Sequence, residues 1–302
     1  HYSLTLWKEL TRIGDEESGM CGGDNPLHHP KTTGARRAAY NFFIIMRCEK
    51  RTDAPDRKET KHMYGWRAKI GLITPMSENA EHAFHLYAPE GVSFASMKIN
   101  FPGPTPEGLT ILTDQLEETA AKYKGMPYQL VVFGCTSGSC IKGVGWDQEC
   151  INQIERASGI PGLTTSTAVL ESLRALGTKK VAVLTPYPEA TNEAEKKFLE
   201  DNGFEVTNIV GMDMSPFSRA DGLSFEDADE VFLYRNATRM DLKGADTFFL
   251  SCMGLTTMEI IDDLEKNMGI PVITSHQATL WSALRHCRIG TKMPKLGKLF
   301  TL

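Results

Sequence analysis

Short apolar runs alternate with amphipathic segments along most of the chain, from about residue 64 onward. Residues 68–75 are largely apolar and end in a proline, which is typical of a short buried strand. Leucines at helical spacing, with glutamates on the opposite face, predict a helix over residues 107–123. Residues 130–133 predict a second buried strand, residues 147–157 a helix, and residues 164–167 a short strand followed by a helix that ends near Gly177. Strands that alternate with helices predict parallel sheets with right-handed crossovers.

The same order of elements recurs in the second part of the chain. Residues 179–186 match residues 68–75 at an offset of 111, and residues 269–282 match residues 159–172 at an offset of 110. The strand that ends at Cys252 matches the strand that ends at Cys135 at an offset of 117. Three ordered matches at nearly one offset indicate an internal duplication. We therefore predict an α/β fold with two pseudo-symmetric halves, each a small parallel sheet flanked by helices, and an active site in the cleft between them.

The first sixty or so residues lack this alternation of strands and helices. We expect residues 1–62 to form a peripheral or poorly ordered extension. The first half is then predicted to span residues 63–165 and the second half residues 166–288, with a C-terminal tail over residues 289–302. The last helix of the second half could pack against the first half.

Composition narrows the class of protein. Hydrophobic residues make up 41% and charged residues 24% of the chain, as in globular proteins. A net charge of −5 gives no reason to expect nucleic acid as a partner. No apolar run approaches the roughly 20 residues that cross a bilayer, so we expect no membrane partner. The seven cysteines are scattered, without a Cys-x-x-Cys pair, which favours reduced thiols in the cytoplasm.

Cys135 and Cys252 each occupy the first turn position after a predicted buried strand, among Gly, Ser and Thr residues. Ligands of open α/β sheets bind at this end of the strands. We therefore predict that the two cysteines, one from each half, share one site. Free backbone N–H groups at such turns would lower the thiol pKa and could bind a carboxylate or an enediolate. Packing in a core is the preferred interpretation for four others: Cys48, Cys140, Cys150 and Cys287.

Two thiols that face each other across a planar carbon can act in two ways. They can remove and return a proton on opposite faces, or one can add covalently while the other delivers a proton. Neither route needs a metal or an organic cofactor, and the chain shows no phosphate-binding glycine fingerprint, so we expect no cofactor. Nearby hydroxyls would add donors for a small carboxylate substrate: Thr136, Ser137, Ser139, Thr256 and Thr257.

Two further strand-end turns could hold a substrate carboxylate. In the second half the candidate is the hydroxyl of Tyr187, for which a core tyrosine is a nearly equal alternative. In the first half the equivalent turn offers Ser77 or Asn79, although turns favour Ser and Asn in any case.

Four motifs together resemble the aspartate/glutamate racemase superfamily: Gly134-Cys135-Thr136-Ser137, Ser251-Cys252-Met253-Gly254-Leu255, Ala88-Pro89-Glu90-Gly91-Val92 and Pro271-Val272-Ile273-Thr274-Ser275. The closest branch is similar to maleate cis-trans isomerases and arylmalonate decarboxylases, over about residues 64–288. The resemblance implies two Rossmann-like or flavodoxin-like halves, no cofactor and a site closed between the halves.

The resemblance also implies roles for individual residues. In maleate isomerases the first-half cysteine, here Cys135, adds to the double bond, and the second-half cysteine, here Cys252, handles the proton. In the decarboxylases a glycine takes the place of the first cysteine. Carboxylate oxygens would be held by hydroxyl or backbone donors of Thr136, Ser137, Tyr187, Met253 and Gly254.

One turn departs from the pattern of the isomerases, which have Pro-Ser-Ser-Asn where this chain has Pro75-Met76-Ser77-Glu78-Asn79. Glu78 near the cleft would repel a dicarboxylate unless its side chain points away. Our first hypothesis is a homo-oligomeric, cofactor-independent isomerase or racemase of a small (di)carboxylate, similar to maleate isomerase. The alternatives are an arylmalonate-type decarboxylase in which Cys252 protonates an enediolate, a dimethylsulfoniopropionate lyase, and a carboxylate-binding protein without enzymatic activity.

Overall fold

The computed structural model describes residues 64–75, 77–217 and 223–302. All of them belong to the second of two compact units, Lys61–Leu302. The extension predicted over residues 1–62, with Cys48, lies outside the described residues.

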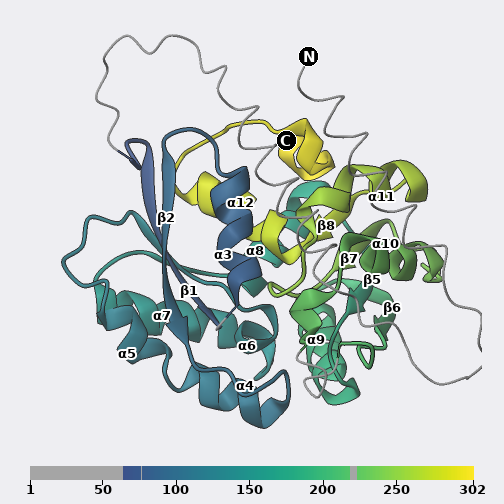
Figure 1. The fold of residues 1–302 in the computed structure, drawn as a ribbon, viewed down its shortest axis with the longest axis horizontal. Helices are drawn as coiled ribbons and strands as arrows, with labels where there is room; N and C mark the ends of the chain where they lie inside the picture. Colours follow the sequence, from purple (N-terminus) through teal and green to yellow (C-terminus); the bar gives the residue numbers. More distant parts are fainter. Residues whose placement is uncertain (1–63, 76, 218–222) are drawn as a thin grey trace, which may run out of the picture. The chain divides into compact units, whose positions relative to one another are not determined.

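Two four-stranded parallel sheets form the core of this unit (Figure 1). The first sheet has the order β2-β1-β3-β4 and the second the order β6-β5-β7-β8. Strands β5 to β8 therefore have the same arrangement in their sheet as strands β1 to β4, as a duplication predicts. This arrangement confirms the predicted α/β fold with two similar halves. The strands are β1 (Ala68–Pro75), β2 (Val92–Ile99), β3 (Leu130–Phe133), β4 (Gly162–Thr164), β5 (Lys180–Thr185), β6 (Glu205–Gly211), β7 (Thr247–Leu250) and β8 (Val272–Thr274).

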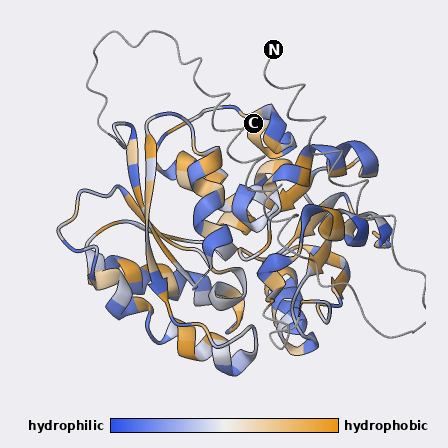
Figure 2. Cartoon of the chain, in the orientation of Figure 1, coloured by the Kyte–Doolittle hydropathy of each residue, from blue (hydrophilic) through white to orange (hydrophobic). Residues whose placement is uncertain are grey.

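Helices follow the strands in both halves. The first half contributes α3 (Glu78–Tyr87), α4 (Pro106–Thr113), α5 (Leu116–Ala121), α6 (Thr136–Cys140), α7 (Trp146–Ser158) and α8 (Thr165–Leu176). The second half contributes α9 (Glu189–Asp201), η2 (Phe225–Asp227), α10 (Glu230–Arg239), η3 (Met258–Ile260), α11 (Ile261–Met268) and α12 (Ser275–His286), followed by η4 (Pro294–Leu296) and η5 (Lys298–Thr301). The central strands β3 and β7 are fully buried, and hydrophobic residues gather on the strands while α11 is largely hydrophilic (Figure 2). Within the described part of the chain, no helix combines the length and the hydrophobicity needed to cross a membrane.

Two predicted elements differ from the observed ones. The single helix predicted over residues 107–123 is broken between α4 and α5, because the side-chain amide of Gln115 donates to the carbonyl of Ile111 at 2.7 Å. The backbone N–H of Gln115 turns to Leu112 O at 3.3 Å instead. The strand predicted over residues 164–167 ends at Thr164, whose side chain accepts a hydrogen bond from the N–H of Thr167 and caps α8.

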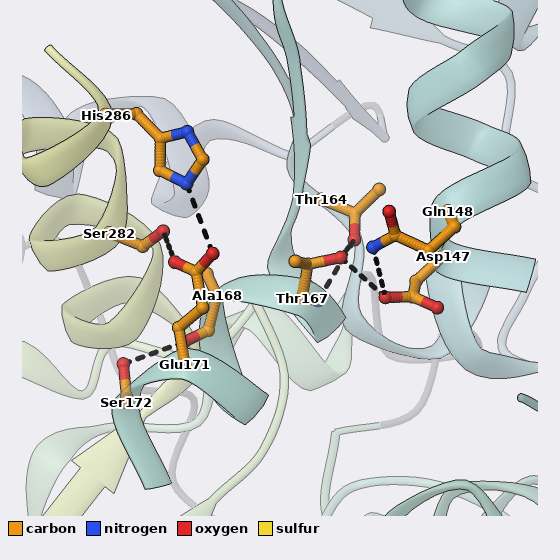
Figure 3. A network of polar contacts seen from close by, with 9 residues as sticks. All are labelled: Asp147, Gln148, Thr164, Thr167, Ala168, Glu171, Ser172, Ser282 and His286. Carbon is orange, nitrogen blue, oxygen red and sulfur yellow. Dashed lines mark hydrogen bonds and ion pairs between the residues drawn. The ribbon is translucent and has the colours of Figure 1, made fainter. Parts of the chain in front are cut away.

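The equivalent helices α8 and α12 pack against each other and join the two halves. The Ser282 hydroxyl on α12 donates to the carboxylate of Glu171 on α8, and His286 Nε2 lies 3.2 Å from the same carboxylate (Figure 3). One turn earlier on α8, Thr167 donates to Asp147 of α7 at 2.7 Å (Figure 3). Helix α12 also contacts α3 and β3, so it touches elements of both halves.

Candidate active site

One cavity lies where β3 and β7 end, with about 380 Å³ of free space including its mouth. Both halves contribute to the lining, which comprises Pro75, Ser77, Ala80, Phe101, Pro104, Cys135, Thr136, Ser137, Tyr187, Phe225, Glu226, Cys252, Met253 and Gly254. Cys135 and Cys252 therefore border the same space.

The first cysteine precedes a short helix in an ordinary backbone conformation. Cys135 has φ −147° and is the N-cap of α6, where its Sγ accepts a hydrogen bond from the N–H of Gly138 at 3.4 Å. Thr136 and Ser137 are the first two residues of α6, so their N–H groups have no acceptor within the helix. Both residues line the cavity, so an anionic group of a substrate would find these N–H groups without an acceptor.

The second cysteine has a strained backbone. Cys252 has φ +118°, a conformation that L-residues rarely adopt and that costs on the order of 1–3 kcal/mol. Its Sγ accepts from the N–H of Gly254 at 3.3 Å, and its own N–H donates to Ser275 Oγ at 2.9 Å. Position 254 requires glycine, because a Cβ there would lie 2.5 Å from the ring of Phe225.

Ser275, the first residue of α12, connects the two cysteine loops. Its hydroxyl accepts from the Cys252 N–H and lies 2.8 Å from Thr136 Oγ1. Ser275 is not among the predicted site residues. The repeat nevertheless pairs Ser275 with Thr165. The Thr165 hydroxyl donates to the carbonyl of Phe133 at the end of β3, so the equivalent hydroxyl of Ser275 could be expected near the end of β7.

The predicted lowering of the thiol pKa is wrong for both cysteines. Burial raises the pKa of Cys135 to about 11, although the Gly138 N–H and the Ser137 hydroxyl act to lower it. Burial likewise raises the pKa of Cys252 to about 12, against the lowering effects of the Gly254 N–H and the Tyr187 hydroxyl. Local N–H groups thus do not offset the removal of the thiols from water.

The remaining predicted residues divide into those that border the cavity and those that do not. Ser77, Tyr187, Met253 and Gly254 join the cysteine loops in the lining. Asn79 is absent from the lining, since its side-chain amide donates to the carbonyls of Glu226 at 2.9 Å and Gly254 at 2.8 Å. It therefore holds the wall of the cavity in place.

Three hydroxyls predicted to be donors are also outside the cavity lining. Ser139 donates to the carbonyl of Cys135 at 2.7 Å and to Ser166, behind the loop. Thr257 is buried against His276, with Oγ1 and Nδ1 3.4 Å apart. Thr256 does not line the cavity either. Glu78 is exposed and does not line the cavity.

Two residues of η2 border the cavity without having been predicted, Phe225 and Glu226. The sequence of residues 212–224 before them has neither helical nor alternating periodicity, so no pattern predicts these two residues. The pKa of the Glu226 carboxyl is raised, mainly by burial and also by Asp227 and Glu78, while Ser77 and Lys98 act in the opposite direction.

A further carboxyl group lies behind the Cys252 loop. Glu195 on α9 is buried, and one of its oxygens accepts a hydrogen bond from the Ser251 hydroxyl at 2.7 Å. The other oxygen has no partner among the described residues. Burial raises the pKa of Glu195 to about 7. No group of three or more His, Cys, Asp or Glu side chains within the described ranges is arranged to hold a metal ion.

Comparison with known proteins matches residues 70–300 to the family described as Arylmalonate decarboxylase. The arylmalonate decarboxylase of Bordetella bronchiseptica is 28% identical over 240 residues, which cover 76% of this chain and 95% of that protein. A solved arylmalonate decarboxylase variant, in which a glycine is replaced by cysteine, is 27% identical with a TM-score of 0.66, over 78% of this chain and all (100%) of that one. A maleate cis-trans isomerase variant of Nocardia farcinica with a covalently bound succinylcysteine intermediate has a TM-score of 0.69 at 20% identity, over 77% of this chain and 98% of that one.

Proposed function

The chain belongs to a family of enzymes, that of arylmalonate decarboxylase, as the motifs at both cysteines predict, and from this premise we propose that it is a cofactor-independent isomerase or racemase of a small carboxylate. Its relatives carry out isomerase or decarboxylase reactions. One observation supports the isomerase or racemase: a thiol from each half borders the same cavity. A decarboxylase that protonates an enediolate would need Cys252 alone.

The substrate carboxylate binds at the two strand-end loops. The N–H groups of Thr136 and Ser137 supply donors at the cavity surface, and the backbone of Met253 adds another on the opposite loop. The hydroxyl of Tyr187, which interacts with the thiol of Cys252, would turn from that thiol to the bound carboxylate. The N–H of Gly254 already donates to Cys252 Sγ, so Gly254 contributes mainly by leaving room for Phe225. Donors fixed in advance stabilise the negative charge that develops on the carboxylate oxygens during proton removal.

Either of two reactions fits a pair of thiols. In a racemisation, one cysteine as thiolate takes the proton from the carbon next to the carboxylate, and the other thiol returns a proton to the opposite face of the enediolate. In a cis-trans isomerisation, the thiolate of Cys135 forms a C–S bond at the double bond and the Cys252 thiol protonates the neighbouring carbon. Rotation about the single bond, return of the proton to Cys252 and cleavage of the C–S bond then complete the reaction.

Cysteine substitutions distinguish these reactions from the decarboxylase. We expect Cys252→Ala to lose all turnover, and Cys135→Ala to lose isomerisation and racemisation by about 10³-fold or more while sparing decarboxylation. Proton NMR in heavy water with maleate, aspartate, glutamate, phenylmalonate and dimethylsulfoniopropionate measures turnover and deuterium uptake together. Cys140→Ala is the matched control, because Cys140 is buried near the site but does not line the cavity. Isomerisation or racemisation that persists at the wild-type rate in Cys135→Ala would contradict the proposal.

The decarboxylase is the second candidate, and the sequence identity of 28% to an arylmalonate decarboxylase favours it. Its signature is the release of carbon dioxide from phenylmalonate by both wild type and Cys135→Ala.

A further inference from the structure

The cavity contains one carboxyl group that the proposed reactions do not use. Among the described residues that line it, Glu226 is the one acidic side chain, and none is Lys, Arg or His. The Glu226 side chain lies against the loop of Cys252, since its Cγ is 3.5 Å from the place where a Cβ at Gly254 would stand. An acidic side chain therefore lies on the cavity wall beside the loop of the second thiol.

The backbone around Glu226 is held in place from both halves. Ser224 and Asp227 form a capping box around the turn that carries Glu226. Asn79 of the first half donates to the Glu226 carbonyl and to the Gly254 carbonyl. Glu226 thus has a fixed position relative to the thiol of Cys252.

Among the described residues, no cation forms an ion pair with Glu226. Lys98 acts on Glu226 through its charge, but its ammonium group lies 3.0 Å from a Glu81 oxygen and donates to the carbonyl of Ser77 at 2.6 Å. The other charged groups that act on Glu226, Asp227 and Glu78, are negative. A half-buried carboxylate without a cation is unfavourable, and a positive group on a ligand would relieve this.

We propose that Glu226 selects the substrate: the site takes a small monocarboxylate whose second polar group is a cation or an N–H donor, and it disfavours dicarboxylates. The inference rests on the proposed function, because it concerns the same cavity. The carboxylate of the substrate binds at the loops of Thr136 and Tyr187, and the cation pairs with Glu226. A second carboxylate in that place would face a like charge.

The pairing also has a consequence for the chemistry. Burial raises the pKa of Cys252 most, and the charge of Glu226 adds a smaller effect in the same direction. A bound cation would cancel this effect, so the correct substrate would ease the deprotonation of the thiol that it meets.

Two probes of matched length test the proposal. Both β-alanine and succinate carry a carboxylate on a two-carbon chain, and they differ in whether the far end is an ammonium or a second carboxylate. We expect wild type to bind β-alanine about tenfold or more tightly than succinate, measured by calorimetry at neutral pH. In Glu226→Gln, which keeps the shape and removes the charge, that ratio should fall about tenfold or reverse. In Glu78→Gln, which removes an exposed neighbouring charge, the ratio should stay unchanged.

Tighter binding of succinate by wild type, no binding of β-alanine at millimolar concentration, or an unchanged ratio in a folded Glu226→Gln would overturn the proposal. Circular dichroism establishes that the variant is folded. Repeating the titrations in the double variant Cys135→Ser, Cys252→Ser separates this inference from the proposed function. A preference for β-alanine without any cysteine-dependent turnover supports the inference and refutes the function. Cysteine-dependent turnover of maleate with a preference for succinate does the reverse.

Discussion

The loops that carry Cys135 and Cys252 occupy equivalent places after β3 and β7, yet their conformations differ. Cys135 has an extended backbone and caps a short helix. Cys252 has a positive φ, and no helix begins at the next residue. Duplication therefore placed a thiol at the same strand end in each half, while the local backbone diverged.

The second loop is kept in its strained form by contacts from several elements. Ser275 accepts from the Cys252 N–H, Asn79 donates to the Gly254 carbonyl, and the ring of Phe225 fills the space that a side chain at position 254 would need. Strain that surrounding structure maintains is common at functional sites. The comparison indicates that the direction of the Cys252 thiol, more than that of Cys135, is fixed by the rest of the fold.

The largest predicted effect is the response of both thiols to pH, because both have a raised pKa. The rate of alkylation by iodoacetamide follows the thiolate fraction, so it should rise about tenfold per pH unit, and about 100-fold from pH 8 to pH 10, at Cys135 and at Cys252. Peptide mapping after timed quenching measures each site separately. If the alkylation rate at either cysteine levels off below about pH 9, the pKa of that thiol is lowered and the raised pKa is contradicted.

The second effect concerns Glu195, which lies behind the Cys252 loop. The ordinary pKa of a glutamate carboxyl is 4.5, and burial raises that of Glu195 to about 7 in the folded protein. The stability that Glu195 contributes is therefore fully present below pH 4.5 and is lost as the pH rises through 7. Glu195→Gln removes this loss. We expect it to raise the free energy of unfolding at pH 8 by about 3 kcal/mol relative to its effect at pH 4.

Urea denaturation of wild type and Glu195→Gln at both pH values tests this expectation. The exposed Glu200→Gln on the same helix is the control and should show no such difference. Equal effects of Glu195→Gln at pH 4 and pH 8 would contradict a raised pKa.

The smallest effect tests the strain directly. Glycine adopts positive φ freely, so Cys252→Gly relieves strain while it removes the same side chain as Cys135→Gly. The Cys252→Gly variant should therefore retain about 1–2 kcal/mol more stability than Cys135→Gly in urea denaturation. If Cys252→Gly proves the less stable of the two, the Cys252 backbone is not strained.

The sequence places a cysteine after a buried apolar strand in each half because the repeat aligns the two, and in the structure both border one cavity. It does not predict Phe225 and Glu226, which reach the cavity through tertiary folding. The direction of the thiol pKa was also out of reach, since the local sequence shows the N–H groups but does not show that both thiols are removed from water. The break at Gln115 depends on a side-chain amide that competes for a backbone carbonyl. The peripheral extension, the domain limits, the homo-oligomer and the cytoplasmic location stay predictions.

The central claim is that Cys135 and Cys252 act on one small molecule in one shared space. Intact mass spectrometry after iodoacetate treatment at about pH 10 tests it most directly, in a variant with serine in place of Cys21, Cys48 and Cys287. The account predicts a single carboxymethyl group per chain, on Cys135 or on Cys252 but not on both, because the first adduct fills the cavity and its negative charge repels a second reagent. Chains that carry adducts on both cysteines at the rates of independent sites would contradict it.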